Sequence, residues 1–302
     1  MSVSEQRVGT ELVAVTVAVA RGGPVVLTAD DGTRLPWGPL QTGTHSMQAG
    51  LRAWVERQTG HRLGYVEQLY TFADAPHDDG DARVISVSYL GLTGAQQDDP
   101  AFAGWYSYFP WEDRRADGAT LAASLQQPLR EWAGCGAGAA ERERRTLRTI
   151  VTFGWDGRPW RPELVLQRYE LLYEAALVPE SAHHRPGGPS APGMPMARDH
   201  RRILATGLAR LRSMIQYRPV VFELMPQDFT LGQLQDVVEA LAGQPVHKQN
   251  FRRLVLQQDL VEKTGATEVE TGGRPAQLFR FRREVLDERL VAGTKLPVAR
   301  TG

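Results

Sequence analysis

The chain has 302 residues, of which 42% are hydrophobic, and this is enough for two domains that each bury a core. No run approaches the roughly 20 apolar residues that a membrane-spanning helix needs, and the start MSVSEQRVGT lacks the pattern of a signal peptide. We therefore expect a globular, cytoplasmic protein with no membrane partner. The single cysteine, Cys135, excludes an internal disulfide and argues against a thiol-rich metal site.

The formal net charge is zero, but the charge is unevenly distributed. Residues 1–197 hold 18 Lys and Arg against 23 Asp and Glu, whereas residues 198–302 hold 17 against 12. The basic C-terminal third is the part that we expect to meet an anionic partner.

One segment interrupts the chain. The sequence SAHHRPGGPSAPGMPM at 181–196 has four prolines, three glycines and no hydrophobic period, which is typical of a linker or an exposed loop. We divide the chain into a first domain at 1–180, this linker or loop at 181–197 and a second domain at 198–302.

In the first domain, β-rich runs predict strands at 12–20, 24–29, 65–73 and 83–92, the first two joined by a hairpin turn at Arg21-Gly22-Gly23. A helix is expected from about Ser46 to Gln58. Leu, Val and Tyr recur with a helical period at 141–153 and 162–178. Mixed strands with helices outside them predict an α+β protein whose first domain is an α/β/α sandwich.

In the second domain, residues 199–217 predict a helix with an apolar stripe of Ile203, Leu204, Leu208, Leu211 and Ile215. A capping box, with Thr230 as N-cap and Gln233 at the third helical position, predicts the start of the next helix. The apolar stripe of that helix is Leu231, Leu234, Val237, Val238 and Leu241, and Gly243-Gln244-Pro245 ends it.

A further helix is predicted at 247–258, HKQNFRRLVLQQ, with Phe251, Leu254 and Val255 inward. A hairpin follows, with a Gly-rich basic tip that carries Arg274. Two helices joined by a short turn place the second helix in a DNA major groove, and a basic hairpin tip suits phosphate or the minor groove. Winged helices also serve as protein-binding modules, so the pattern leaves both partners open.

The first domain resembles the Nudix hydrolase family. The resemblance lies in the order of a hairpin, Leu35-Pro36-Trp37-Gly38, a loop, the helix RAWVERQTG at 52–60 and strands ending in VISVSYLGL. The family signature is G-x5-E-x7-R-E-U-x-E-E-x-G-U, in which U is a bulky aliphatic residue. Its glutamates bind Mg2+ on a diphosphate, because a hard cation prefers oxygen ligands.

The glutamates of that signature are absent from this chain. With Gly60 on the closing glycine, Ala53-Trp54 replaces the Arg-Glu pair and Arg57-Gln58 replaces the two metal-binding glutamates. Moving the register by one recovers Gly38, Arg52 and Glu56 but still leaves Arg57 at a metal-binding position. We predict a Nudix-shaped domain with no catalytic residue and no metal site; the alternative is an amphipathic helix unrelated to catalysis.

The whole chain, from about residue 11 to 283, resembles the Nudix-related transcriptional regulators of NAD metabolism, the NrtR and NadQ group. The motifs that carry this resemblance are EQLYTFADAP, RYELLYEAALV, FTLGQLQ, the NFRR helix and GGRPAQLFRF. The resemblance implies a repressor that binds an operator through its winged helix and senses ADP-ribose, NAD or ATP in its Nudix-like domain. It also implies a homodimer, which reads a pseudo-palindromic operator.

The resemblance also implies the residues of the two sites. The DNA-contacting residues are Thr230, Gln233, Lys248, Gln249, Asn250, Arg252, Arg253 and Arg274. The effector-binding residues are Arg34, Trp37, Arg52, Arg57, Tyr70 and Arg83, because guanidinium groups suit pyrophosphate and aromatic rings stack on adenine.

Two rival functions stay open at this point. One is a Nudix-type nucleoside diphosphate hydrolase with an atypical metal site, which would depend on Glu56, Glu67 and the DDGD run at 78–81. The other is a nucleotide-binding protein whose winged helix contacts another protein. On the sensor interpretation the protein is not an enzyme and requires no cofactor.

Overall fold

A computed structural model describes residues 8–20, 22–40, 46–73, 83–94, 99–217, 220–268 and 275–282. The chain divides into two compact units. Unit 1 comprises residues 1–224 and 239–245, and unit 2 comprises residues 225–238 and 246–302. In the described part of the chain, no helix is both long enough and apolar enough to cross a membrane.

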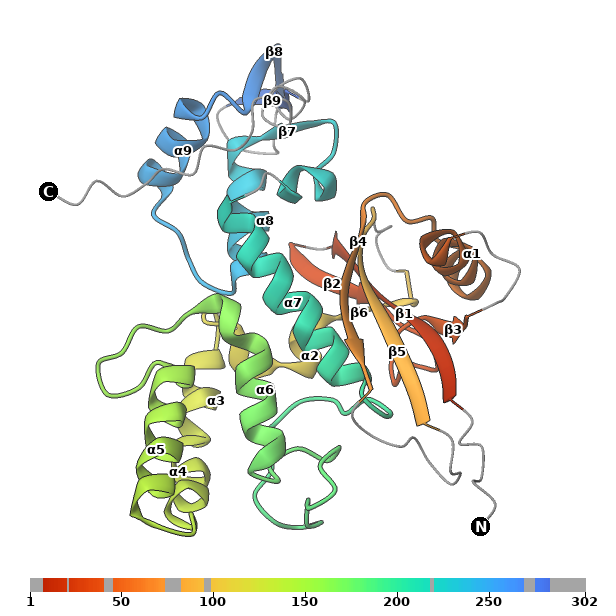
Figure 1. The fold of residues 1–302 in the computed structure, drawn as a ribbon. Coiled ribbons are helices and arrows are strands. Elements are labelled where there is room, and N and C mark those ends of the chain that lie inside the picture. The colour runs from red at the N-terminus through yellow and green to blue at the C-terminus, as the bar shows by residue number, and fades with distance from the viewer. Residues whose placement is uncertain are drawn as a thin grey trace, which may run out of the picture. The chain divides into compact units, whose positions relative to one another are not determined.

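Unit 1 is built on a mixed six-stranded sheet (Figure 1). Its strands are β1 (Val8–Ala20), β2 (Gly23–Leu27), β3 (Trp37–Pro39), β4 (Val66–Phe72), β5 (Arg83–Leu92) and β6 (Phe102–Gly104). The order is β4-β5-β1-β2-β6, and β3 pairs with β1. The long central pair β1 and β5 is parallel, whereas the other pairs are antiparallel.

One helix covers each face of this sheet (Figure 1). The helix α1 (Met47–Thr59) begins at Ser46, whose hydroxyl accepts the Ala49 N–H, and buries Leu51 and Val55 against the sheet. Burial of each of these side chains contributes about 1.5–3 kcal/mol. The helix α7 (His200–Tyr217) lies on the other face, where Gly207 approaches Val15 so closely that a Cβ would lie 2.6 Å from the Val15 side chain. The α/β/α sandwich predicted from the sequence is confirmed.

The rest of unit 1 is helical. It contains α2 (Trp105–Tyr108), η1 (Pro110–Glu112), α3 (Gly118–Ser124), α4 (Gln126–Gly134), α5 (Ala139–Phe153), η2 (Pro162–Leu164), α6 (Val165–Glu174) and η3 (Val220–Leu224). The segments predicted to be helical at 141–153 and 162–178 correspond to α5 and α6. The helices between residues 105 and 134 were not predicted.

The domain boundary differs from the sequence-based division. We predicted that residues 198–302 form the second domain, but α7 packs on the sheet of unit 1 and counts with that unit. The Pro/Gly-rich segment is a loop of unit 1, because Ala191 N–H donates to Leu177 O (2.7 Å) and Met194 N–H to Ser107 O (2.8 Å). The boundary therefore falls after Leu224, beyond α7.

Unit 2 has the elements of a winged helix. They are β7 (Asp228–Thr230), α8 (Leu231–Ala242), α9 (Lys248–Gln257), β8 (Val261–Glu268) and β9 (Ala276–Phe281), and the three strands form a sheet in the order β7-β9-β8. The helix α8 begins in unit 2, while its residues from Glu239 onward count with unit 1. Leu254, predicted to face inward, is instead 43% exposed, whereas Phe251 and Val255 are partly buried.

Candidate nucleic-acid interface and Nudix-like site

The outer surface of α9 is polar and basic. The side chains of Lys248, Gln249, Asn250, Arg252 and Arg253 are all exposed. The His247 ring accepts the Asn250 N–H (3.4 Å) and so caps the start of the helix. Amide and guanidinium groups on the first two turns of an exposed helix match the hydrogen-bonding groups of base edges and phosphates.

Two of these side chains hold each other in place. Arg253 Nη2 donates to Asn250 Oδ1 at 2.8 Å, three residues earlier on the same helix face. The contact orients the guanidinium and leaves its other N–H groups directed to solvent or a partner, because Arg carries five donors. Asn250 therefore orients the Arg253 side chain and also presents its own amide group.

Thr230 and Gln233 form the predicted capping box. Thr230 N–H donates to Gln233 Oε1 (2.8 Å), and Gln233 N–H donates to Thr230 Oγ1 (3.1 Å). Gln233 Nε2 also donates to Glu268 Oε2 (3.1 Å), and Thr230 is only 8% exposed. These contacts give both residues a structural role at the start of α8, and the phosphate contact implied for them stays a prediction.

The wing is the β8–β9 hairpin. The two strands pair antiparallel from Val261↔Phe281 to Glu268↔Ala276, with an irregularity between Lys263 and Thr267. Arg280 Nε pairs with Asp228 Oδ1 at 2.9 Å. Arg274, the residue expected at the wing tip, lies outside the described residues, so its contact with DNA stays a prediction.

In unit 1, the end of α1 supports the first Nudix register. Gly60 has a φ of +73°, and its N–H donates to Glu56 O at 2.8 Å, which is the left-handed C-cap that favours glycine. Val55, at the bulky aliphatic position of the signature, is fully buried. The two residues that fit the signature therefore fulfil its structural requirements.

Two of the residues that replace signature glutamates, Trp54 and Gln58, are hydrogen-bonded to β3. The Trp54 indole N–H donates to Pro39 O (3.2 Å), and its ring lies so close to Gly38 that a Cβ there would overlap it. Gln58 accepts the Trp37 N–H (3.1 Å) and donates to Trp37 O (2.7 Å). An indole offers no oxygen ligand, and the neutral Gln58 amide is held by the Trp37 backbone, so the two do not replace the anionic oxygen ligands of a Mg2+ site.

Two of the carboxylates that would support a hydrolase, Glu56 and Glu67, are each paired with a cation. Glu56 Oε1 accepts Arg62 Nε at 2.8 Å, and Glu67 Oε1 accepts Arg210 Nε at 2.9 Å. Across the described residues, no three His, Cys, Asp or Glu side chains gather in a metal-binding cluster. The DDGD run at 78–81 lies outside those residues.

The predicted effector residues separate into different surroundings. Arg52 donates to the Leu63 and Gly64 carbonyls (2.9 Å to Gly64), which ties α1 to the chain that follows it. The Arg57 guanidinium lies 4.4 Å from the centroid of the Trp54 ring. Tyr70 is 59% exposed on β4. The side chain of Arg83 lies outside the described residues.

Arg34 and Trp37 are brought together, with an arginine that the sequence did not single out. The guanidinium carbons of Arg34 and Arg198 each lie 5.6 Å from the centroid of the Trp37 ring. Arg198 follows the Pro/Gly-rich loop, so nothing in its local sequence marked it. We call Arg34, Trp37 and Arg198 the arginine site.

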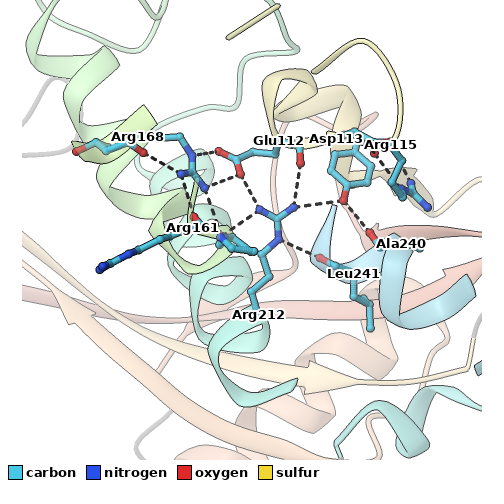
Figure 2. A network of polar contacts seen from close by, with 11 residues as sticks. Glu112, Asp113, Arg115, Arg161, Arg168, Arg212, Ala240 and Leu241 are labelled. Carbon is cyan, nitrogen blue, oxygen red and sulfur yellow. Dashed lines mark hydrogen bonds and ion pairs between the residues drawn. The ribbon is translucent and has the colours of Figure 1, made fainter. Parts of the chain in front are cut away.

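A second group of arginines lies at a buried carboxylate (Figure 2). Arg168 and Arg212 both donate to Glu112 Oε2, at 2.8 and 2.6 Å, and all three side chains are almost fully buried. Burial alone would raise the pKa of the Glu112 carboxyl, but the charges and hydrogen bonds of the two guanidinium groups hold its pKa below the ordinary value. Glu112 is therefore ionised at neutral pH.

The same group holds the end of α8 within unit 1. Arg212 Nε donates to Leu241 O (2.9 Å), and the Tyr106 hydroxyl donates to Ala240 O (2.7 Å) (Figure 2). Gly243 follows with a φ of +71°, and a Cβ there would overlap the Glu112 carbonyl oxygen. A cation at the last carbonyls of a helix also interacts favourably with the helix dipole.

The fold defines the class of protein: a Nudix-like domain joined to a winged helix. The crystal structure of Shewanella oneidensis NrtR complexed with a 27mer DNA superposes with a TM-score of 0.53 at 20% identity, covering 92% of this chain and 95% of that one. A MutT/nudix family protein from Enterococcus faecalis gives 0.50 at 14% identity, covering 92% and 89%. At these identities the two structures establish the fold alone.

The winged helix is of the NrtR type. Residues 221–281 match the NrtR DNA-binding winged helix domain family. The ADPR responsive transcriptional repressor NtrR of Acinetobacter baylyi is 38% identical over 86 residues, which are 28% of this chain and 34% of that protein. The chain thus matches about a third of the length of this curated relative.

Proposed function

We propose that the protein is a transcriptional repressor of genes for NAD synthesis or salvage. It binds a pseudo-palindromic operator as a homodimer, through one winged helix per subunit. The observation that carries the proposal is the match of residues 221–281 to an NrtR DNA-binding domain, together with the exposed basic surface of α9. The Acinetobacter relative, which is described as a transcriptional repressor, supports it.

We further propose that the Nudix-like domain of unit 1 senses ADP-ribose, or failing that NAD or ATP, without hydrolysing it. The Acinetobacter relative is described as ADPR responsive. Arg57 and Gln58 at the positions of the two metal-binding glutamates support binding without turnover. The ligand acts by binding one arrangement of the dimer better, and a difference of about 3 kcal/mol changes operator affinity roughly 150-fold.

The first test is a mobility shift with the full-length protein on DNA upstream of its own gene and of neighbouring NAD genes. We expect a specific shift that one of the three nucleotides strengthens or abolishes, and the direction identifies the effector as corepressor or inducer. Affinity should fall steeply with salt, because phosphate contacts release counterions. Absence of any specific shift at low salt, with or without nucleotides, would contradict the repressor function.

Arg253→Ala tests whether α9 reads the DNA. Loss of a guanidinium contact should weaken operator binding by about 1–3 kcal/mol, roughly 5- to 150-fold, while folding stays intact. Arg130→Ala is the matched control, since Arg130 is exposed on α4 in unit 1, and it should bind like the wild type. Equal binding by both variants would exclude Arg253 from the interface.

The hydrolase alternative is tested directly. The protein is incubated with ADP-ribose and Mg2+ or Mn2+, and AMP is measured by chromatography. We expect no turnover above the buffer control, and steady release of AMP would overturn the sensor proposal.

A further inference from the structure

The arginine site lies at β3, the strand whose backbone is hydrogen-bonded to the end of α1. Gln58 stands at the position of a metal-binding glutamate, and its amide makes two hydrogen bonds with the backbone of Trp37. Gly38 faces Trp54 of α1, so the side chain of Trp37, the preceding residue of the strand and the partner of Val13, points to the opposite face of the sheet, where α7 lies. Arg34 and Arg198 each lie 5.6 Å from the Trp37 ring centroid. A cationic group therefore lies at the strand that the end of α1 contacts, on the sheet face away from α1.

Two hydrogen bonds from distant parts of the chain fix this arrangement. Ala197 N–H donates to Thr33 O at 2.8 Å, and Leu35 N–H donates to the buried His200 ring at Nδ1 (3.0 Å). Ala197 and His200 lie on either side of Arg198, and Thr33 and Leu35 lie on either side of Arg34. The site is thus built by the docking of the segment before α7 onto the turn before β3.

Arg198 adopts a backbone conformation that side chains rarely accept. Its φ is +54°, in the left-handed region, which costs a residue other than glycine roughly 1–2 kcal/mol. Strain of this kind is often found at ligand-binding positions. Glycine would adopt this φ at a lower cost, yet the position holds an arginine.

The two guanidinium groups have donors to spare. Within the described residues, neither makes a hydrogen bond, and their ion pairs are long: Arg34 to Asp30 at 3.6 Å and Arg198 to Glu11 at 3.7 Å. The Arg198 Nε atom is buried without a partner. Glu11 already accepts the Ser86 hydroxyl at 2.6 Å. Buried polar groups normally have a hydrogen-bond partner. The Arg198 guanidinium therefore lacks an acceptor that a bound anion would supply.

We propose that Arg34 and Arg198 bind the diphosphate of the adenine nucleotide directly, at a site on the α7 face of the sheet that needs no metal. This inference rests on the proposed sensing function. Guanidinium groups are always charged and match phosphate oxygens bidentately, so they neutralise a diphosphate without a metal. Without metal to activate water, a bound nucleotide is retained rather than cleaved.

The experiment is isothermal titration calorimetry of the full-length protein with ADP-ribose, in Mg2+ and in EDTA. We expect dissociation constants within about threefold of each other in the two buffers. Arg198→Ala and Arg34→Ala should each weaken binding tenfold or more, since a charge-assisted hydrogen bond contributes at least about that factor. Inorganic pyrophosphate should compete with ADP-ribose in the wild type.

Arg62→Ala serves as the control variant. Arg62 is exposed in the segment after α1 and pairs with Glu56, outside the arginine site, so its removal should leave binding unchanged. Binding that requires Mg2+, or Arg198 and Arg34 variants that bind like the wild type, would overturn the arginine site and leave the sensing function intact. A wild-type protein that binds none of ADP-ribose, NAD and ATP in either buffer would overturn both.

Discussion

Unit 1 contains two groups of arginines in opposite settings. Arg168 and Arg212 are buried and make five hydrogen bonds each, to Glu112, to a tyrosine hydroxyl and to backbone carbonyls. Arg34 and Arg198 are partly exposed and make none within the described residues. Both groups also contact tryptophan rings.

The difference shows how hydrogen-bond satisfaction separates structural arginines from binding ones. A guanidinium whose five donors are all used has nothing to offer a ligand, and its removal leaves buried acceptors without partners. A guanidinium with unused donors beside an aromatic ring has the chemistry to bind an anion. Substitutions should therefore affect stability in the first group and ligand binding in the second.

The largest effect is expected for Arg212→Ala. Removing one partner of a buried ion pair costs about 3–5 kcal/mol, because Glu112 keeps only Arg168 and the Leu241 and Pro162 carbonyls lose a donor. The free energy of unfolding is measured by chemical denaturation with tryptophan fluorescence. All seven tryptophans lie in unit 1, so the signal reports that unit alone.

The control for this prediction is Arg148→Ala. Arg148 also pairs with a carboxylate, Glu174, but the two side chains are 38% and 46% exposed. A solvent-exposed ion pair contributes about 0–1 kcal/mol, so this variant should unfold almost like the wild type. Equal losses in the two variants would mean that the Glu112 group has no special structural importance.

Gly243→Ala tests how tightly the same group closes on the end of α8. Alanine would adopt a left-handed φ, and its Cβ would overlap the Glu112 carbonyl oxygen and approach Arg212 Nη2 to 2.6 Å. We expect a loss of about 2–4 kcal/mol from strain and overpacking together. Gly157→Ala is the matched variant, because Gly157 has a φ of +79° with nothing within 4 Å of a Cβ, so it reports the strain alone.

Local patterns predicted most of the helices and strands, including the capping box of Thr230 and Gln233. They did not predict which part of the protein α7 packs against. Its apolar stripe shows which face is buried but not whether a sheet or a winged helix covers it. Arg212 lies within this buried face, and a charged residue among apolar ones was a signal that a buried partner exists.

The arginine site was only partly predictable. Arg34 and Trp37 lie near the Nudix motif and were identified from it, whereas Arg198 lies 161 residues beyond Trp37 in a segment interpreted as a linker or loop. Its position depends on contacts of Ala197 and His200 with the turn before β3, which are tertiary and leave no mark in the local sequence. The same contacts explain why the segment is part of unit 1.

The smallest expected effect is at Arg198, and it gives the sharpest test of the difference between the structural and the binding arginines. Arg198→Gly and Arg198→Ala remove the same guanidinium, but only alanine keeps the cost of the +54° φ. The glycine variant should be about 1 kcal/mol more stable than the alanine variant by chemical denaturation. The two variants should lose ADP-ribose binding equally, because ligand affinity depends on the side chain and stability on the backbone. If both variants instead lost stability as Arg212→Ala does, Arg198 would belong with the structural arginines, and the distinction between the two groups would fail.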